Sequence, residues 1–425
     1  MKRRFFPVLL ATLACAPAVT SAPRTTAPAA ITATRAAAVR VGLDVFLDSV
    51  PAWATAKRLG LITNNAGVDG TGRSNIDRLT ARRDVKLVTL FAFEHGLRGE
   101  APAGAHIASG VDERSGLPVY SLYGEVQKPT PRMLDGVDIL LYDVQDVGAR
   151  PYTRVSTMAL SMKAAAEKGI PFVVLDRPNP LGGVEVEGPV LETPFASFVG
   201  MYPIPLRHGM TLGELARLYN ERFGIGADLR VISMRGWRRE LRFASTGLPW
   251  VGPSPNIRTL EAALLYPGTV LIEGTNLSEG RGTSRPFEQL GAPWLRADDV
   301  AREMSALGLP GVRVETARLV VAADARKYGG QTIPGVRLVV TDAGLFRPVR
   351  TALHLIDVAR RLHPTSFAWV GANRREPNLL TIDRLAGTDR ARKAIEAGTL
   401  EELLRRNDQD AAAFRALREP YLLYR

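Results

Sequence analysis

The sequence predicts an α/β protein with a Rossmann-like, doubly wound, mostly parallel sheet and a second, smaller α+β domain. Three observations support this. The expected strands before residue 260 are short apolar runs without polar alternation, which is typical of strands buried on both faces. Helical segments lie between them, as in βαβ units. The chain has 425 residues, 46% hydrophobic and 23% charged, so two domains are expected.

The N-terminal segment is expected to be a targeting signal. Residues 1–22 combine a basic start, an apolar run and small residues, the layout of a secretory signal peptide. The Ala/Pro/Thr-rich residues 23–38 predict a disordered tether. The only cysteine, Cys15, lies in the signal, and lipoprotein anchoring there is the less favoured alternative to ordinary cleavage. We therefore expect an exported protein, periplasmic or secreted, without disulfides.

Residues 39–260 are expected to form the Rossmann-like domain. Its strands are predicted at 39–46, 58–63, 85–93, 137–142 and 171–175, and its helices at 52–58, 75–83, 153–168 and 210–223. A turn is expected at 64–67. In the last helix, Thr211 is the expected N-cap and Glu214 follows three residues later, which predicts a capping box.

Residues 261–425 are expected to form the auxiliary α+β domain, because the sequence pattern changes after residues 253–256. The segments predicted here are helices at 259–265, 351–362 and 401–417, strands at 269–272, 312–315 and 336–341, and a Gly/Ser/Arg loop at 276–286. The sequence contains no internal repeat.

The charge balance bears on possible partners. The net charge is +12, and removal of a signal peptide with three basic residues leaves +9. A basic exported protein is expected to associate with polyanions such as the cell wall, although a solvated basic surface explains the charge equally well. Nucleic acid is not expected, because no aromatic-interleaved basic cluster is present. Stable membrane insertion is not expected either, because no later segment approaches about 18 consecutive apolar residues.

Polar side chains follow the predicted parallel strands, at the sheet edge where such folds bind ligands. The residues concerned are Asn64 and Asn65, then Glu94 and His95, then Asp143, Asp146, Arg150 and Tyr152, and finally Asp176, Arg177 and Asn179. Turn formation or structural ion pairing is the alternative for several of them. Glu94 is the hardest to explain structurally, because it follows an apolar strand. Partial desolvation favours a protonated carboxyl, as a proton donor requires.

A second candidate site lies in the loop 276–284. Arg281 stands between two glycines next to Glu279, and this pattern predicts a backbone nest for an anion. A flexible surface loop is the alternative. Arg207 and His208 form a similar pair, for which a structural role is favoured over ligand binding.

Several common sites are excluded by their missing motifs. No HExxH, HxxxH or CxxC spacing supports a metal centre, and no G-x-G-x-x-G or Walker lysine supports a nucleotide site. No G-x-S-x-G elbow supports a serine hydrolase. The sequence therefore predicts no cofactor and no metal.

A set of long motifs resembles one known family. They are FEHGLRGE (93–100), GLPVYSLYG (116–124), KPTPRML (128–134), DVQDVGARPYT (143–153), PFVVLDRPNPLGG (171–183), VEGPVL (186–191), FVGMYPIPLRHGMTLGELARLYN (198–220) and LSEGRGTSRPFE (277–288). Together they are similar to the exo-β-N-acetylmuramidase (NamZ) family across residues 40–425. The resemblance implies an exo-acting glycoside hydrolase that releases N-acetylmuramic acid from the non-reducing end of peptidoglycan fragments during cell-wall turnover. It also implies a cleft between the two domains.

The resemblance also implies residue roles. The family's catalytic glutamate corresponds to Glu94, with His95 beside it, and Phe93 stands where the family usually has proline. Asp143 or Asp146 is the candidate nucleophile or base, and the gap to Glu94 decides between retention and inversion. Attack by the sugar's own 2-acetamido group is a third route.

Substrate contacts are expected from the remaining strand-end and loop residues. The lactyl carboxylate of muramic acid needs a cation, and the candidates are Arg98, Arg150 and Arg281. The other predicted contacts are Asn64, Asn65, Tyr152, Asp176, Arg177, Asn179 and Glu279. Two alternatives remain: a non-catalytic cell-wall sugar-binding protein, and a metal-dependent hydrolase of another bond.

Overall fold

The computed structural model describes Met1, Pro7 and residues 38–94, 96–97, 109–371 and 379–425. Residues 23–37 of the predicted tether, Cys15 and almost all of the predicted signal peptide lie outside the described residues, as do the candidate site residues His95 and Arg98. Residues 37–425 form one unit.

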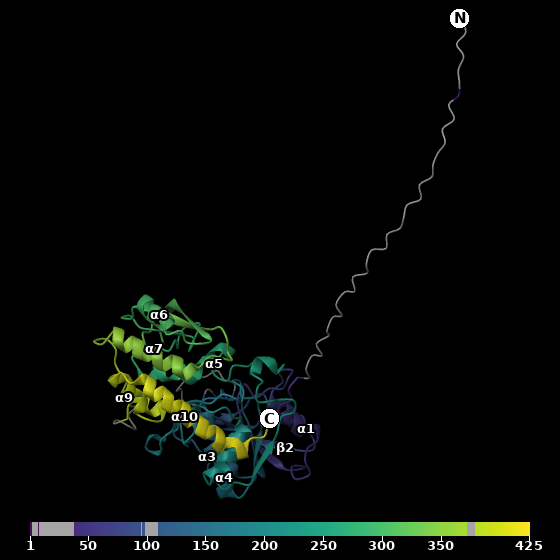
Figure 1. Ribbon diagram of the computed structural model, residues 1–425. Helices are drawn as coiled ribbons and strands as arrows, with labels where there is room; N and C mark the ends of the chain where they lie inside the picture. The colour runs from purple at the N-terminus through teal and green to yellow at the C-terminus, as the bar shows by residue number, and fades with distance from the viewer. Residues whose placement is uncertain (2–6, 8–37, 95, 98–108, 372–378) are drawn as a thin grey trace. The chain divides into compact units, whose positions relative to one another are not determined.

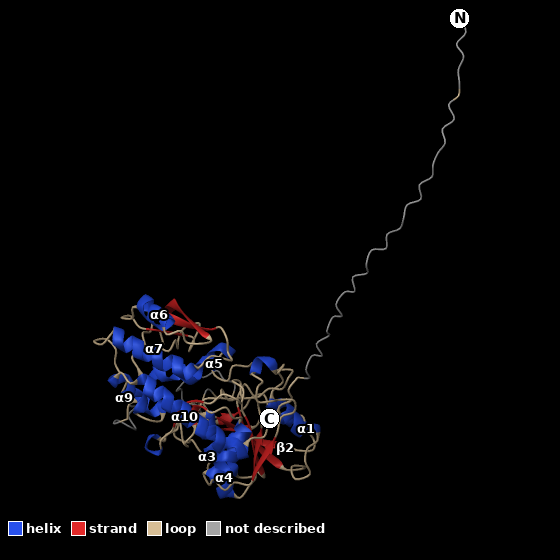
Figure 2. Cartoon of the chain, in the orientation of Figure 1, coloured by secondary structure: helices blue, strands red, loops and turns tan. Residues whose placement is uncertain are grey.

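A seven-stranded sheet organises the first part of this unit (Figures 1 and 2). In spatial order its strands are β3 (Gly110–Val111), β4 (Pro118–Ser121), β2 (Lys86–Ala92), β1 (Arg58–Thr63), β5 (Ile139–Asp143), β6 (Phe172–Leu175) and β9 (Leu229–Ile232). All neighbouring pairs are parallel except β3 with β4. The parallel strands, counted along the chain, have the doubly wound order 3-2-1-4-5-6, which reverses between β1 and β5. The predicted fold class is confirmed.

Alternate residues of the strands enter two apolar cores, one on each face of the sheet. On one face, Leu141 packs with helices α1 (Gly42–Asp48) and α2 (Asn75–Thr80). On the other face, its neighbour Leu140 packs with α3 (Arg154–Lys168) and α4 (Leu212–Arg222). Burial on both faces explains why the strands lack polar alternation.

Three local predictions are wrong. Residues 39–46 were expected to form a strand, but only Arg40 makes a bridge, to Arg235, before α1 begins. A short apolar run is compatible with the periodicity of a helix as well as with that of a strand. In the structure, the backbone of Gly42 lies against that of Asp176, and its N–H donates to the Asp176 carbonyl at 2.8 Å. Residues 52–56 form turns instead of a helix. Residues 269–272 belong to the end of helix α5 (Leu260–Thr269) and the 3₁₀-helix η4 (Val270–Gly274), not to a strand.

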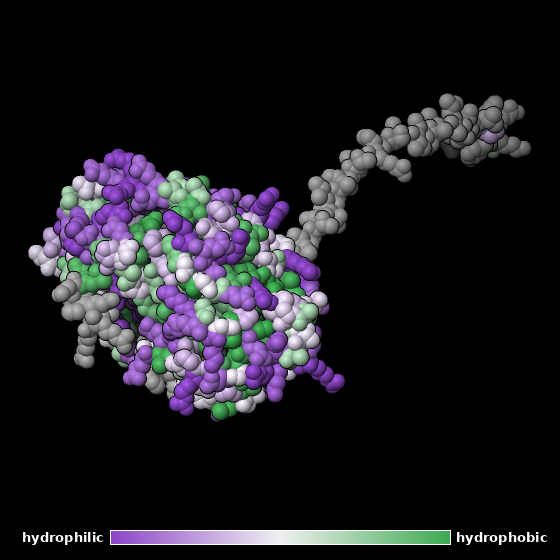
Figure 3. Space-filling model, turned by 90° about the horizontal axis from the view of Figure 1, so that it is seen from below, coloured by the Kyte–Doolittle hydropathy of each residue, from purple (hydrophilic) through white to green (hydrophobic). Residues whose placement is uncertain are grey.

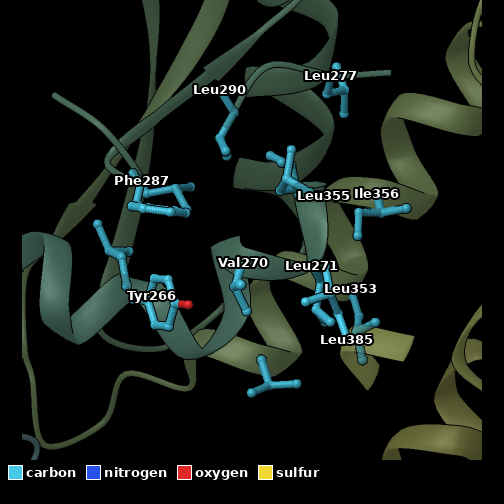
Figure 4. Close-up of a cluster of buried hydrophobic side chains, with 14 of the residues drawn as sticks. Tyr266, Val270, Leu271, Leu277, Phe287, Leu290, Leu353, Leu355, Ile356 and Leu385 are labelled. Atoms are coloured by element: carbon cyan, nitrogen blue, oxygen red, sulfur yellow. The ribbon is translucent and has the colours of Figure 1, made fainter. Parts of the chain in front are cut away.

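The C-terminal part contains a three-stranded antiparallel sheet and the remaining α-helices of the described chain. Its elements after η4 are β10 (Gln289–Gly291), α6 (Ala297–Ala306), β11 (Val312–Val320), β12 (Thr332–Val340), α7 (Pro348–Leu362), α8 (Thr381–Ala386), α9 (Arg390–Ala397) and α10 (Leu400–Arg418). Its apolar core gathers around α5 and α7, where the rings of Tyr266 and Phe287 meet edge-on (Figure 4). The same core includes Ala149, Tyr152 and Leu206 from the first part of the chain, so the two parts share buried surface.

Shorter elements complete the fold. They are the antiparallel pair β7 (Glu187–Val190) and β8 (Pro205–Arg207), and the 3₁₀-helices η1 (Pro131–Leu134), η2 (Thr193–Phe195), η3 (Phe243–Ser245) and η5 (Glu419–Tyr421). On the face seen in Figure 3, polar and apolar residues are interspersed. Within the described ranges, no helix is long and apolar enough to cross a bilayer.

The last residues of the chain pack onto the first part of the molecule. Helix α10 contacts β7, and η5, which follows it, contacts α4. Figure 1 shows α10 leading to the C-terminal end of the chain. The hydroxyl of Tyr424 donates to Oδ2 of Asp176 at 2.7 Å and accepts from the backbone N–H of Met234 at 2.9 Å. Its ring meets Trp237 edge-on, with 5.0 Å between centroids. Burial raises the pKa of Asp176 to about 6.

Replacing Tyr424→Phe is expected to lower the free energy of unfolding by about 1–3 kcal/mol, because it leaves the Met234 N–H and one Asp176 oxygen with fewer partners in a buried site. Urea denaturation measures the change. Tyr421→Phe is the control, because the Tyr421 hydroxyl forms no hydrogen bond with any described residue. Equal stability of the two variants would contradict the assignment.

Candidate active site

Glu94 lies at the carboxyl end of the parallel sheet, two residues after β2, and is partly exposed. Its Oε1 accepts a hydrogen bond from the hydroxyl of Tyr123 at 3.1 Å, and its Oε2 accepts one from Oγ1 of Thr153 at 3.3 Å. Tyr123 follows β4, which pairs with β2, and Thr153 immediately precedes α3. Three separate elements therefore fix the carboxyl group while leaving it accessible.

The Tyr123 phenol remains a hydrogen-bond donor at neutral pH. Burial raises its pKa to about 12, and the neighbouring Glu94 carboxylate raises it further than Arg154 and Arg281 lower it. A protonated phenol next to a carboxylate gives a charge-assisted hydrogen bond. Tyr123 therefore orients one oxygen of Glu94.

A buried cation, Arg154, lies beside Glu94. Its guanidinium carbon is 4.1 Å from the ring centroid of Phe93 and 4.8 Å from that of Tyr152, so the group makes cation–π contacts with both rings. Nη2 donates to the carbonyl of Pro253 at 3.2 Å. Nε and Nη1 have no hydrogen-bond partner among the described residues.

A chain of aromatic contacts joins this region to the C-terminal part. Tyr152 meets Tyr266 edge-on at 5.7 Å, and Tyr266 meets Phe287 edge-on at 4.9 Å. The guanidinium of Arg281 lies 4.9 Å from the Phe287 ring centroid. The predicted site residues Tyr152 and Arg281 are therefore brought to the same region as Glu94.

Arg281 is the predicted cation that combines solvent access with nearby acids. Its side chain is 30% exposed, Nη2 donates to Glu273 at 2.8 Å, and Nε lies 3.3 Å from Glu279. Burial alone would lower the pKa of Arg281, but Glu273 and Glu279 raise it above its ordinary value. Glu279 is buried and also pairs with Lys327 at 3.0 Å.

Asp143 and Arg177 pair with each other. Nε of Arg177 lies 2.5 Å from Oδ1 of Asp143, and its Nη2 lies 3.1 Å from Oδ2. Asn75 donates to the same Oδ2 at 2.8 Å. Both members of the pair are buried. The ends of β5 and β6 are thus joined by an internal bidentate ion pair.

Asp146 is also buried and bound to protein groups. Its Oδ2 accepts from the backbone N–H of Gly148 at 2.8 Å. Nε2 of His208 is 3.5 Å from the same oxygen, and Nδ1 of His208 accepts from the N–H of Met210 at 3.2 Å. Nε2 of His208 and Oδ1 of Asp146 are buried and have no hydrogen-bond partner among the described residues.

The other predicted contact residues bind backbone groups, except that Asp176 also binds two side-chain hydroxyls. Arg150 donates to the carbonyls of Leu385 and Ala386, and burial lowers its pKa to about 9. The remaining bonds run from Asn64 to Pro253, from Asn65 to Gly252 and from Asn179 to Met210, while Asp176 accepts from Thr211, Gly213, Arg177 and Tyr424. Asp176 thereby holds the first turn of α4. These contacts give each residue a structural function.

The sequence interpretation missed three residues around Glu94. Tyr123 follows a four-residue, partly exposed strand without a clear pattern, although it lies inside the motif 116–124. Thr153 and Arg154 were assigned only to the start of a helix. In the described part of the chain, no group of three or more His, Cys, Asp or Glu side chains could hold a metal ion.

Comparisons with known proteins agree with this architecture. Residues 59–261 match the family described as exo-beta-N-acetylmuramidase NamZ, N-terminal, and residues 264–424 match its C-terminal counterpart. The chain is 47% identical over 387 residues to the peptidoglycan beta-N-acetylmuramidase NamZ of Bacillus subtilis strain 168, with 91% of each protein covered.

Two crystal structures of DUF1343 family proteins from Bacteroides fragilis are also similar. One has a TM-score of 0.83 at 34% identity, and the other has a TM-score of 0.68 at 30% identity. Each match covers 91% of this chain and 99% of the other. The chain therefore belongs to the NamZ family of exo-β-N-acetylmuramidases, a family of glycoside hydrolases.

Proposed function

We propose that this protein releases N-acetylmuramic acid from the non-reducing ends of peptidoglycan fragments, with Glu94 as general acid. The observation that carries the proposal is the Glu94 carboxyl, held at the end of β2 by two hydroxyl donors yet open to solvent. Such a group can deliver a proton to a glycosidic oxygen. The name of the Bacillus subtilis relative, peptidoglycan beta-N-acetylmuramidase, supports this class of reaction.

The buried aspartates bear on which group attacks the anomeric carbon of the sugar. Asp143 is bound to Arg177 and Asn75, and Asp146 is bound to the Gly148 N–H beside His208. Attack by the 2-acetamido group of the sugar does not require a second carboxylate at the anomeric carbon. This route is compatible with Asp143, whose two oxygens are both bound to protein groups, and with the buried position of Asp146, and we favour it over direct attack by either.

Arg281 is the proposed partner of the lactyl carboxylate. It is partly exposed and lies beside Phe287, whereas Arg150 is buried on the carbonyls of Leu385 and Ala386. A guanidinium offers a carboxylate two parallel hydrogen bonds. His95 and Arg98 remain candidates for further contacts beside Glu94.

Export is part of the proposal, because the substrate lies outside the cytoplasm. Residues 1–22 are proposed to act as a signal peptide, with lipid attachment at Cys15 as the alternative. Intact-mass analysis of the mature protein separates the two: simple cleavage gives an unmodified chain that begins after Cys15, whereas acylation retains Cys15 with the added mass of its lipid.

The direct test is incubation with muropeptides, followed by mass spectrometry and proton NMR of the first-formed anomer. Release of free N-acetylmuramic acid, with the β-anomer formed first, is expected for a substrate-assisted reaction. An α-anomer would instead indicate inversion. Binding without release would favour a sugar-binding protein, and activity lost to EDTA and restored by a divalent ion would favour metal-dependent hydrolysis.

Tyr123→Phe is expected to reduce kcat about 10- to 100-fold, because Glu94 becomes a carboxylate as it gives up its proton, and the hydrogen bond from Tyr123 is then charge-assisted and worth about 1.5–3 kcal/mol. Steady-state kinetics with a chromogenic muramic acid glycoside measures the loss. Tyr120→Phe is a matched control on the preceding strand, where the ring packs against Phe91 at 5.8 Å. Equal kcat values for the two variants would show that Tyr123 does not position the acid.

A further inference from the structure

A cavity of about 150 Å³ lies between β7, α7 and the C-terminal helix α10. It is lined by Glu187, Gly188, Arg347, Val349, Arg350, Leu404, Asn407 and Asp408. A water molecule occupies about 30 Å³ of the liquid, so the cavity has room for several waters or one small organic molecule.

Glu187 presents an unused oxygen in this cavity. The residue is 8% exposed, and its Oε1 accepts from the backbone N–H of Arg350 at 2.8 Å, in the first turn of α7. Its Oε2 is buried and has no hydrogen-bond partner among the described residues. A buried carboxylate oxygen without a donor is unfavourable, so a donor is expected to occupy the adjacent space.

Asn407 of α10 also lines the cavity and is only 4% exposed. Within the part of the chain that the structure describes, neither its Oδ1 nor its Nδ2 has a hydrogen-bond partner. One cavity is therefore bordered by two buried side chains with three unused polar atoms. Two of these atoms accept hydrogen bonds and one donates.

The charges around the cavity are balanced. Arg350 pairs with Asp408 at 3.0 Å, and Arg347 lies 3.2 Å from Glu185. Glu187 faces the fully buried Arg207 of β8 across the β7–β8 pair. Burial raises the pKa of Glu187 to about 7, although Arg207, Arg347 and Arg350 oppose the shift. With Glu187 ionised, the two acids and two arginines of the lining have no net charge.

We propose that this cavity binds a small zwitterion of the size of a simple α-amino acid. Its ammonium group would donate to Oε2 of Glu187 and Oδ1 of Asn407. Its carboxylate would accept from Nδ2 of Asn407 and from the guanidinium of Arg347. A net-neutral ligand preserves the charge balance of the lining, and its ammonium and carboxylate match the unused acceptors and donor of Glu187 and Asn407. This site is independent of Glu94 and of the proposed reaction.

The test is isothermal titration calorimetry and thermal unfolding of the full chain with glycine, L-alanine and D-alanine as probes. At least one amino acid is expected to bind and to raise Tm. Methylamine, acetate and glycerol, which carry only the ammonium, the carboxylate or hydroxyl groups, are expected to bind at least 10-fold more weakly.

Two variants connect the binding to the site. Asn407→Leu and Glu187→Gln are expected to weaken amino-acid binding at least 10-fold, whereas Gln409→Leu, on the exposed side of α10, leaves it unchanged. Circular dichroism shows whether each variant is folded, and either folded variant suffices for the comparison. Binding is also expected to strengthen as pH rises through about 7, because Glu187 then becomes ionised beside Arg207, Arg347, Arg350 and Asp408.

Three results would overturn the proposal. One is that none of the amino acids binds at millimolar concentration, which would indicate a water-filled cavity. Another is that glycerol binds as well as the amino acids, which would indicate a polyol site. The third is that both cavity variants bind the amino acid as the unmodified chain does. All three readouts are independent of hydrolysis and remain valid if the proposed reaction is wrong.

Discussion

Glu94→Gln is expected to reduce turnover of a poor-leaving-group muramic acid glycoside by about 10²–10⁴-fold, the usual contribution of a general acid. Glutamine has nearly the same shape, and its single carbonyl oxygen can still accept from Tyr123 or from Thr153, but its amide group cannot donate an acidic proton. The free energy of unfolding should therefore change by less than about 1 kcal/mol, since the residue is partly exposed.

The leaving group makes this prediction specific to acid catalysis. A glycoside of a strongly acidic phenol needs little protonation, so its hydrolysis should be much less affected by Glu94→Gln than hydrolysis of a disaccharide. Glu125→Gln, an exposed neighbour of Tyr123, is the control and should behave as the unmodified enzyme. A uniform loss across all leaving groups would assign Glu94 a different role, and unchanged activity would remove it from the mechanism.

Asp143→Ala is expected to lower the free energy of unfolding by about 3–5 kcal/mol, because it leaves the Arg177 guanidinium buried without its counter-ion. Urea denaturation measures the loss. Adding Arg177→Met should recover part of it by removing the isolated charge. Glu167→Ala, which breaks the exposed ion pair with Lys128, is the control and should cost at most about 1 kcal/mol.

Activity separates the two possible roles of Asp143. If Asp143 only holds the ends of β5 and β6 together, the double variant should retain measurable hydrolysis at a temperature where it is folded. A variant that is as stable as the unmodified chain but inactive would instead place Asp143 directly in the reaction.

The sequence predicted the central strands well because they are buried on both faces. The runs 58–63, 85–93, 137–142 and 171–175 correspond to β1, β2, β5 and β6 within two residues at each end. Edge and half-buried strands carried a weaker signal: β4 includes Tyr120, β9 includes Arg230, and neither was predicted. The 39–46 segment was wrong because its conformation depends on the contact between Gly42 and Asp176, far along the chain.

The expectation that residues after parallel strands gather at one edge of the sheet identified a set of residues, but it could not predict where their side chains point. Asp143 and Arg177 leave different strands and bind each other, whereas Arg150 turns toward α8. These directions depend on partners such as Asn75 and the Leu385 carbonyl, which are distant in sequence. Tyr123 shows the converse case, in which a side chain outside the predicted set reaches Glu94.

The return of the final segment to the first sheet limits how this protein can be divided for experiments. Arg217 of α4 donates to three successive carbonyls, those of Pro420, Tyr421 and Leu422, and Glu214 accepts from the N–H of Leu423. A truncated version ending near residue 260 would expose these groups together with Trp237. Although the two family matches meet at 261–264, the N-terminal half should aggregate or unfold when expressed by itself. An affinity tag would disturb the N-terminal half least if it were placed away from Tyr424.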